Sequence, residues 1–209
     1  MRWYLGGVRI PVHAALLALL LACALPAAAQ SPPGAAPDPA APAHGLGDKT
    51  LSLSLGPTFP LFYLSSAGLT GTNLKLLGGT ASISWSAYVN GAIQIGAEIG
   101  GGFAFSRPNW NSLLMLPILV KGQYVLDLYP FEVPISLGVG MNVVKYGDLK
   151  NLDLLIKPGA SLMYIYDSKW SFGANLAWWW DMQFYPTDPS QSRIGNFLEL
   201  SASVLYHYQ

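Results

Sequence analysis

The chain has 209 residues, of which 52% are hydrophobic and only 11% are charged. A soluble domain carries about 25% charged residues, so charge alone does not account for the surface of this protein. Its 11 basic and 11 acidic residues give a formal net charge of zero, which argues against a basic face and a nucleic-acid partner.

The first 29 residues have the pattern of a secretory signal peptide. Arg2 and Arg9 precede an apolar run over residues 12–25, and the small residues 27–29 follow it. This run is shorter than the about 20 apolar residues that a transmembrane helix needs. We therefore predict that residues 1–29 are a cleaved signal peptide and take no part in the fold.

The only cysteine, Cys23, lies inside this leader. A mature chain that starts near Gln30 therefore forms no disulfide and holds no thiolate-bound metal. The run Leu20-Leu21-Ala22-Cys23 also resembles a bacterial lipobox, in which the cysteine is acylated and becomes the mature N-terminus. The apolar run continues past the cysteine and favours simple cleavage, but a Cys23-acylated periplasmic barrel lipoprotein is left open as an alternative.

Residues 30–47 are mostly Pro, Ala and Gly and are predicted to form a flexible tether. In the predicted folded domain, residues 48–209, no helix-period segment occurs, and apolar residues recur at every second position, which indicates β-strands. Each candidate strand can reach the about 9–11 residues of a tilted membrane strand. The eight candidates cover residues 49–57, 74–89, 92–105, 112–126, 131–145, 153–166, 169–184 and 196–208.

The connections between these strands alternate in length. The short turns fall at Asn90-Gly91, Asp127–Pro130 and Asp167-Ser168. The longer loops are 58–73, 106–111, 146–152 and 185–195. Short turns at one end and longer loops at the other are typical of an all-β, single eight-stranded antiparallel up-and-down transmembrane β-barrel. We expect the longer loops outside the cell and both ends of the chain in the periplasm.

The alternation separates a bulky face from a small, polar one. The bulky face includes Leu51, Leu53, Leu55, Ile83, Ile95, Ile99, Ile118, Val120, Leu198 and Leu200. The small, polar face includes Ser82, Ser84, Ser86, Gly96, Gly138, Gly140, Ser201 and Ser203. An eight-stranded barrel is only just wide enough for side chains, so the small face is expected inside and the bulky face outside. Such an exterior is unsuited to water and suits hydrocarbon, where a closed barrel leaves no backbone group unpaired.

Aromatic residues collect near both ends of the predicted strands. This distribution is typical of the two aromatic girdles of outer-membrane barrels, at the two membrane–water interfaces. The predicted girdle residues are Trp85, Tyr124, Tyr164, Tyr166, Trp170, Trp178, Trp180, Tyr206 and Tyr208.

With its strand number, alternation and girdles, the region 48–209 resembles the small eight-stranded bacterial outer-membrane barrels, the class of OmpX, OmpW and the transmembrane part of OmpA. The last strand, FLELSASVLYHY, looks like the C-terminal assembly signal of that class, except that Gln209 follows the final aromatic residue. The resemblance implies an integral bacterial outer-membrane protein. Its expected partners are outer-membrane lipid and lipopolysaccharide, the outer-membrane assembly machinery acting on the C-terminal strand, and a surface ligand of unknown nature.

Few charged residues occupy the predicted inner face. Glu98 and Lys121 lie at similar heights on neighbouring strands and are predicted to form an ion pair, because an isolated charge in a narrow interior is costly. The predicted interior ion-pair network and polar plug consists of Glu98, Lys121, Glu132, Lys157, Asp181 and Glu199. Within this network we expect Lys157, Asp181 and Glu199 to form a second group nearer the loops. Glu132 is expected near the turns.

No catalytic residue, cofactor or metal site is predicted. His13 and His44 lie in the leader and the tether, and His207 lies at the turn end, away from loops that would meet lipopolysaccharide. The sequence therefore predicts a non-enzymatic, porin-like envelope protein with a structural or surface-display role, which lets small or apolar solutes pass at most narrowly. A lipid A-modifying outer-membrane enzyme is the alternative, since some barrels of this size act on that lipid.

Overall fold

A computed structural model describes residues 44–66, 68–72, 74, 77–105, 112–185 and 192–209. The chain divides into two compact units, Met1–Pro39 and Ala40–Gln209, and all described residues belong to the second. The predicted signal peptide and most of the predicted tether lie outside the described residues, as does the predicted loop 106–111. In the part that is described, no helix has the length and apolarity to cross a bilayer.

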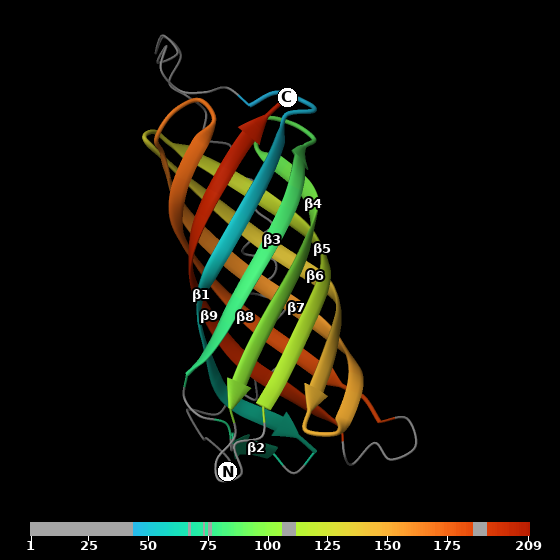
Figure 1. Ribbon diagram of the computed structural model, residues 1–209. Helices are drawn as coiled ribbons and strands as arrows, with labels where there is room; N and C mark the ends of the chain where they lie inside the picture. The colour runs from blue at the N-terminus through green and yellow to red at the C-terminus, as the bar shows by residue number, and fades with distance from the viewer. Residues whose placement is uncertain (1–43, 67, 73, 75–76, 106–111, 186–191) are drawn as a thin grey trace, which may run out of the picture. The chain divides into compact units, whose positions relative to one another are not determined.

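The described residues form a closed antiparallel sheet of eight long strands, with one short strand at its margin (Figure 1). The strands are β1 (Lys49–Ser65), β2 (Gly68–Gly71), β3 (Gly78–Tyr88), β4 (Ile93–Phe105), β5 (Ser112–Leu128), β6 (Phe131–Tyr146), β7 (Leu149–Ile165), β8 (Trp170–Gln183) and β9 (Arg193–Tyr208). Apart from β2, each strand pairs with the next in the chain, and β9 pairs with β1 to close the barrel. The predicted fold, an eight-stranded up-and-down barrel, is confirmed.

The predicted loop 58–73 is largely strand. β1 continues to Ser65 and pairs there with β9 and β2, so most of the segment 58–73 is ordered sheet. The segment contains Pro60, and the pairing register of β1 with β9 shifts between Pro60 and Phe62. Proline is tolerated at such an irregularity because it leaves one ladder position without a donor.

The predicted loop 146–152 is a tight turn instead. β6 ends at Tyr146 and β7 begins at Leu149, so only Gly147 and Asp148 connect them. Gly147 has a φ of 58°, a left-handed conformation that glycine adopts without a steric penalty. The polar residues on both sides of this turn, among them Lys145, Lys150 and Asn151, belong to the two strands.

The predicted orientation of the two faces is confirmed. Leu55 is 68% exposed and Val120 is 66% exposed, whereas Ser86 and Ser171 are almost completely buried inside the barrel. The close approach of neighbouring strands requires the small inner residues. A Cβ atom added to Gly96 would collide with the Trp85 carbonyl oxygen, for example.

The interior is more apolar near the loops than we predicted. A buried cluster occupies that half of the barrel and consists of Leu74, Ala104, Leu113, Met115, Leu119, Val144, Leu155, Ala177, Trp179 and Phe197. These large side chains fit because glycines lie opposite them. A Cβ on Gly138 would be 3.1 Å from Leu119 Cδ1, and one on Gly102 would be 3.2 Å from Met115 Cε. The polar inner face therefore gives way to a packed apolar layer, which we call the apolar layer below.

Candidate functional site

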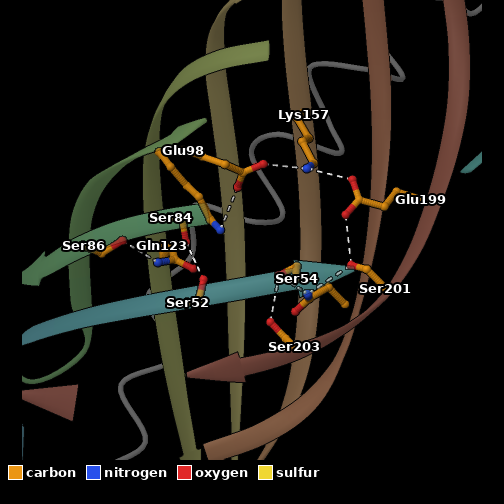
Figure 2. Close-up of polar contacts among 12 residues, drawn as sticks. Ser52, Ser54, Ser84, Ser86, Glu98, Gln123, Lys157, Glu199, Ser201 and Ser203 are labelled. Carbon is orange, nitrogen blue, oxygen red and sulfur yellow. Dashed lines mark hydrogen bonds and ion pairs between the residues drawn. The ribbon is translucent and has the colours of Figure 1, made fainter. Parts of the chain in front are cut away.

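Four charged side chains meet at the centre of the barrel. Lys157 Nζ lies 2.7 Å from Glu98 Oε1 and 2.8 Å from Glu199 Oε2, and Lys121 Nζ lies 3.1 Å from Glu98 Oε2. Figure 2 shows Lys157 between the two carboxylates. The predicted contact between Glu98 and Lys121 is present in the structure. We call these four residues the central ion network; they balance at two positive and two negative charges.

Trp179 links this network to the apolar layer. Its Nε1 donates a hydrogen bond of 2.8 Å to Glu199 Oε2, and the Lys157 ammonium lies 4.8 Å from the centre of its ring. Ser201 Oγ donates to the other oxygen of Glu199 at 2.9 Å. We did not predict an inner role for Trp179, although a signal existed. In three consecutive tryptophans on one strand, the middle side chain must face opposite to the outer two.

Hydroxyl and amide groups fill the barrel between the network and the turns. Asn175 Nδ2 donates to Ser54 Oγ at 3.1 Å and to Ser201 Oγ at 3.2 Å, so it ties β8 to β1 and β9. Figure 2 also shows the contacts Ser52–Ser84 at 2.6 Å, Ser54–Ser203 at 2.8 Å and Gln123–Ser86 at 3.1 Å. Gln123 also donates to Gln94 Oε1 at 3.1 Å. The two cavities beside these groups have volumes of only about 30 and 40 Å³, enough for a few water molecules.

Two of the predicted network residues lie elsewhere. Asp181 accepts a hydrogen bond of 3.0 Å from Asn142 Nδ2 and contacts neither Lys157 nor Glu199 among the described ion pairs. The predicted grouping of Asp181 with these residues is therefore wrong. The reason is register: Asp181 pairs with Leu155, one inward position closer to the loops than Lys157, and the apolar layer intervenes.

Glu132 lies at the turn end of the barrel and binds His44. The His44 Nε2 and Glu132 Oε1 atoms are 2.8 Å apart. The His44 ring stacks on Tyr88 at 4.4 Å and on His207 at 5.1 Å, between ring centres. Residue 44 precedes the first strand, so the segment that leads into the barrel also closes the interior at this end.

The environment of His44 favours its protonated form. Burial lowers the pKa of an imidazole, but here the hydrogen bond that His44 donates to Glu132 and the negative charges of Glu132, Asp127 and Asp48 outweigh burial. The pKa of His44 is therefore raised above its ordinary value of 6.5. The contact with Glu132 is an ion pair whenever His44 carries its proton.

A serine–histidine contact also lies at the turn end. Ser171 Oγ and His207 Nε2 are 3.1 Å apart, and the buried Nδ1 of His207 has no partner among the described residues. A serine nucleophile must be open to its substrate, whereas Ser171 is 0% exposed. The contact is one of internal packing.

The predicted girdle residues occupy the outer face. At the turn end, Trp170 packs on Tyr206 at 4.8 Å between ring centres, and Trp85 Nε1 donates to the Tyr208 hydroxyl at 2.8 Å. Nearer the loops, Trp178 Nε1 donates to Asn196 Oδ1 at 3.1 Å. The turn-end set also includes the exposed rings of Tyr124, Tyr164 and Tyr166. Trp180 is half-buried and lies on the same face of β8 as Trp178. Their role at a membrane boundary stays a prediction.

Several solved barrels share this architecture. Neisserial surface protein A (NspA) aligns over 78% of this chain and 97% of its own length, with a TM-score of 0.58 and 13% identity. OprG, an outer-membrane protein of Pseudomonas aeruginosa, aligns over 79% and 98%, with a TM-score of 0.51 and 9% identity. Ail of Yersinia pestis aligns over 78% and 99%, with a TM-score of 0.50 and 9% identity. The fold is that of the small eight-stranded outer-membrane barrels.

Sequence relatives exist in two bacteria. An uncharacterized protein of Borreliella burgdorferi is 25% identical over 178 residues, which is 75% of this chain and 82% of the relative. One of Treponema pallidum is 24% identical over 172 residues, 78% of each chain. A protein-family model matches residues 35–206, which is most of the chain. The chain therefore belongs to the family that this model describes.

Proposed function

We propose that this chain is a non-enzymatic integral protein of the bacterial outer membrane, in which a rigid, filled barrel displays its loops at the cell surface. The observation that carries this proposal is the outer face. Large apolar side chains are exposed on every long strand of the closed sheet. A water-soluble monomer tolerates exposed apolar patches of only a few hundred Å², so a lipid environment accounts for this surface.

The proposed orientation rests on the two ends of the barrel. The start of β1 and the end of β9 pair at Lys49 and Tyr208, so both lie at the turn end. In bacterial barrels the short turns face the periplasm. We therefore propose that the loop end, with β2 and the connection between β8 and β9, faces outward, and that β9 is the strand offered to the assembly machinery.

The proposed transport capacity is small. From the turns to the loops, the layer of hydroxyl and amide groups, the central ion network and the apolar layer follow one another along the lumen, and the cavities beside the network have room for only a few water molecules. An eight-stranded barrel has little room beyond its side chains. The role that fits such a filled lumen is structural support or display, in the sense in which NspA is called a surface protein.

The membrane location can be tested on the whole chain expressed in a Gram-negative host. We expect the protein in the outer-membrane fraction, with a folded form that migrates faster on a detergent gel than the boiled form. An epitope inserted at Gly147-Asp148 should be labelled on intact cells, and one appended after Gln209 only after the outer membrane is permeabilised. A fold that stays soluble without detergent, or the reverse labelling pattern, would refute the location or the orientation, respectively.

A further inference from the structure

A cavity of about 430 Å³ opens at the loop end of the barrel, on the far side of the apolar layer from the central ion network. Apolar side chains of that layer are part of its lining, among them Leu113, Val144 and Phe197. This volume lies within the about 300–1,000 Å³ that is typical of small-molecule sites. The cavity therefore has the volume and part of the apolar lining that are typical of a ligand pocket.

Two buried carboxylates line one wall of this cavity. Asp153 on β7 is 4% exposed and Asp181 on β8 is 7% exposed, and both belong to the lining. Neither forms an ion pair with a described residue. A buried carboxylate without a cation is costly, so an ammonium group brought into the cavity would recover much of that cost.

A buried acceptor without a partner lies beside these carboxylates. Asn142 pairs with Asp153 across β6 and β7 and donates its Nδ2 to Asp181 Oδ1 at 3.0 Å. The Oδ1 of the same amide is fully buried and has no partner in the described part of the chain. Arg193 is a cation on this lining; it acts electrostatically on both carboxylates but forms no ion pair with either. Its Nε donates to Gln183 Oε1 at 2.6 Å, its guanidinium lies 5.5 Å from the Tyr63 ring centre, and the Gln183 side chain also hydrogen-bonds Asp153. Two buried carboxylates therefore share the influence of one cation, whose direct contacts are with Gln183 and Tyr63.

The surroundings favour an organic cation over a metal ion. Among the described residues, no group of three His, Cys, Asp or Glu side chains is close enough to hold one metal. The rings of Tyr63, Tyr146 and Phe197 line the same cavity as the carboxylates. Aromatic and apolar walls bind a carbon skeleton, and aromatic faces also attract an ammonium group.

We propose that the loop-end cavity is a binding site for a small organic cation, a primary ammonium joined to an apolar or aromatic group. The ammonium contacts Asp153 and Asp181, and the apolar group packs against the lining residues Leu113, Val144 and Phe197. The site depends on the barrel fold and not on the proposed role in the envelope, so the two proposals can fail separately.

The test uses the full barrel in lipid nanodiscs, with empty nanodiscs as the blank, and titration calorimetry with three ligands of one shape. We expect 2-phenylethylammonium to bind, and the neutral 2-phenylethanol and the anionic phenylacetate to bind about tenfold more weakly or not at all. Equal binding of the alcohol and the ammonium would overturn the proposal without any variant being made.

Isosteric variants locate the site. Asp181→Asn and Asp153→Asn each replace one buried carboxyl group by a neutral amide and should weaken binding of the ammonium about tenfold. Asp148→Asn is the matched control, since it removes an exposed carboxylate from the turn at the same end of the barrel. A loss of affinity in Asp148→Asn equal to that in Asp181→Asn would indicate attraction by the general surface charge and would contradict the proposed site.

Discussion

Lys157 on β7 reaches Glu98 on β4 across the lumen, with 2.7 Å between Nζ and Oε1, although β5 and β6 separate the two strands in the sheet. The same ammonium binds Glu199 on β9 from the other side. One lysine therefore holds three strands that are not neighbours. In a barrel whose backbone bonds join only adjacent strands, such a contact stabilises the cross-section itself.

The first prediction concerns this lysine. Lys157→Met keeps the length of the side chain but leaves Glu199 without a described cation, so we expect a loss of about 3–5 kcal/mol in the free energy of unfolding. Lys121→Met should cost about 1 kcal/mol, because Lys121 is more exposed and has one partner. Urea unfolding in lipid vesicles, followed by tryptophan fluorescence, measures both. Equal losses would show that the bridge across the lumen adds nothing.

The second prediction concerns passage through the barrel. The wild-type protein should give little or no current in planar bilayers, because the central ion network and the neighbouring hydroxyl and amide groups fill the lumen. The charge-balanced double variant Glu98→Ala/Lys157→Ala removes the centre of the plug and should conduct small ions. Ser136→Ala, which alters the wall of the same small cavity without touching an ion pair, serves as the control. Large stable currents from the wild type would contradict the plug.

The third prediction separates lipid from water at the outer face. Val120 and Leu149 are 66% and 65% exposed, but Val120 lies in the middle of β5 and Leu149 at the loop-end margin of β7. In a bilayer, Val120→Arg should destabilise the barrel by about 2–4 kcal/mol and Leu149→Arg by about 0–1 kcal/mol. Refolding yields into vesicles and unfolding by urea report the difference. On a water-facing surface the two variants would behave alike.

The fourth prediction is a pH dependence from His44. Because the pKa of His44 in the folded barrel lies above 6.5, its ion pair with Glu132 stabilises the fold fully below that pH. This contribution is lost as the pH rises through the raised pKa. The wild type should thus lose more stability than His44→Gln between about pH 5.5 and about pH 8.5. Parallel pH profiles of the two proteins would show that His44 does not titrate in this way.

The sequence predicted most of the barrel because alternation and the width of the lumen act locally. On β3 and β4 the small alternate residues face the crowded interior: Ser82, Ser84, Ser86, Gly96 and Gly102. The bulky residues between them, such as Ile83 and Ile99, face outward. The same reasoning failed at β5, where Leu113 to Leu119 is apolar on both faces, and the buried apolar layer was missed. Periodicity carries no information where both faces have the same character.

Contacts between strands that are not neighbours could not be predicted from the sequence, because they depend on the register of the whole closed sheet. Glu98 and Lys121 could be paired from their distances to the neighbouring turns, because hairpins fix the register of adjacent strands. The meeting of Lys157 with Glu98 and the separation of Asp181 from both depend on the tilt of the strands around the closed barrel. No count along the chain specifies that tilt.

The amino-acid order alone determined the inner and outer faces wherever small or polar residues alternate with bulky apolar ones, since each side chain's face follows from its position in a strand. Only the closed tertiary structure decided which inner residues touch, placed His44 over the turn-end opening, and left Asp153 and Asp181 on an open cavity. The physical reason is that contacts across a lumen join residues far apart in sequence, and their meeting is set by the closure of the whole sheet.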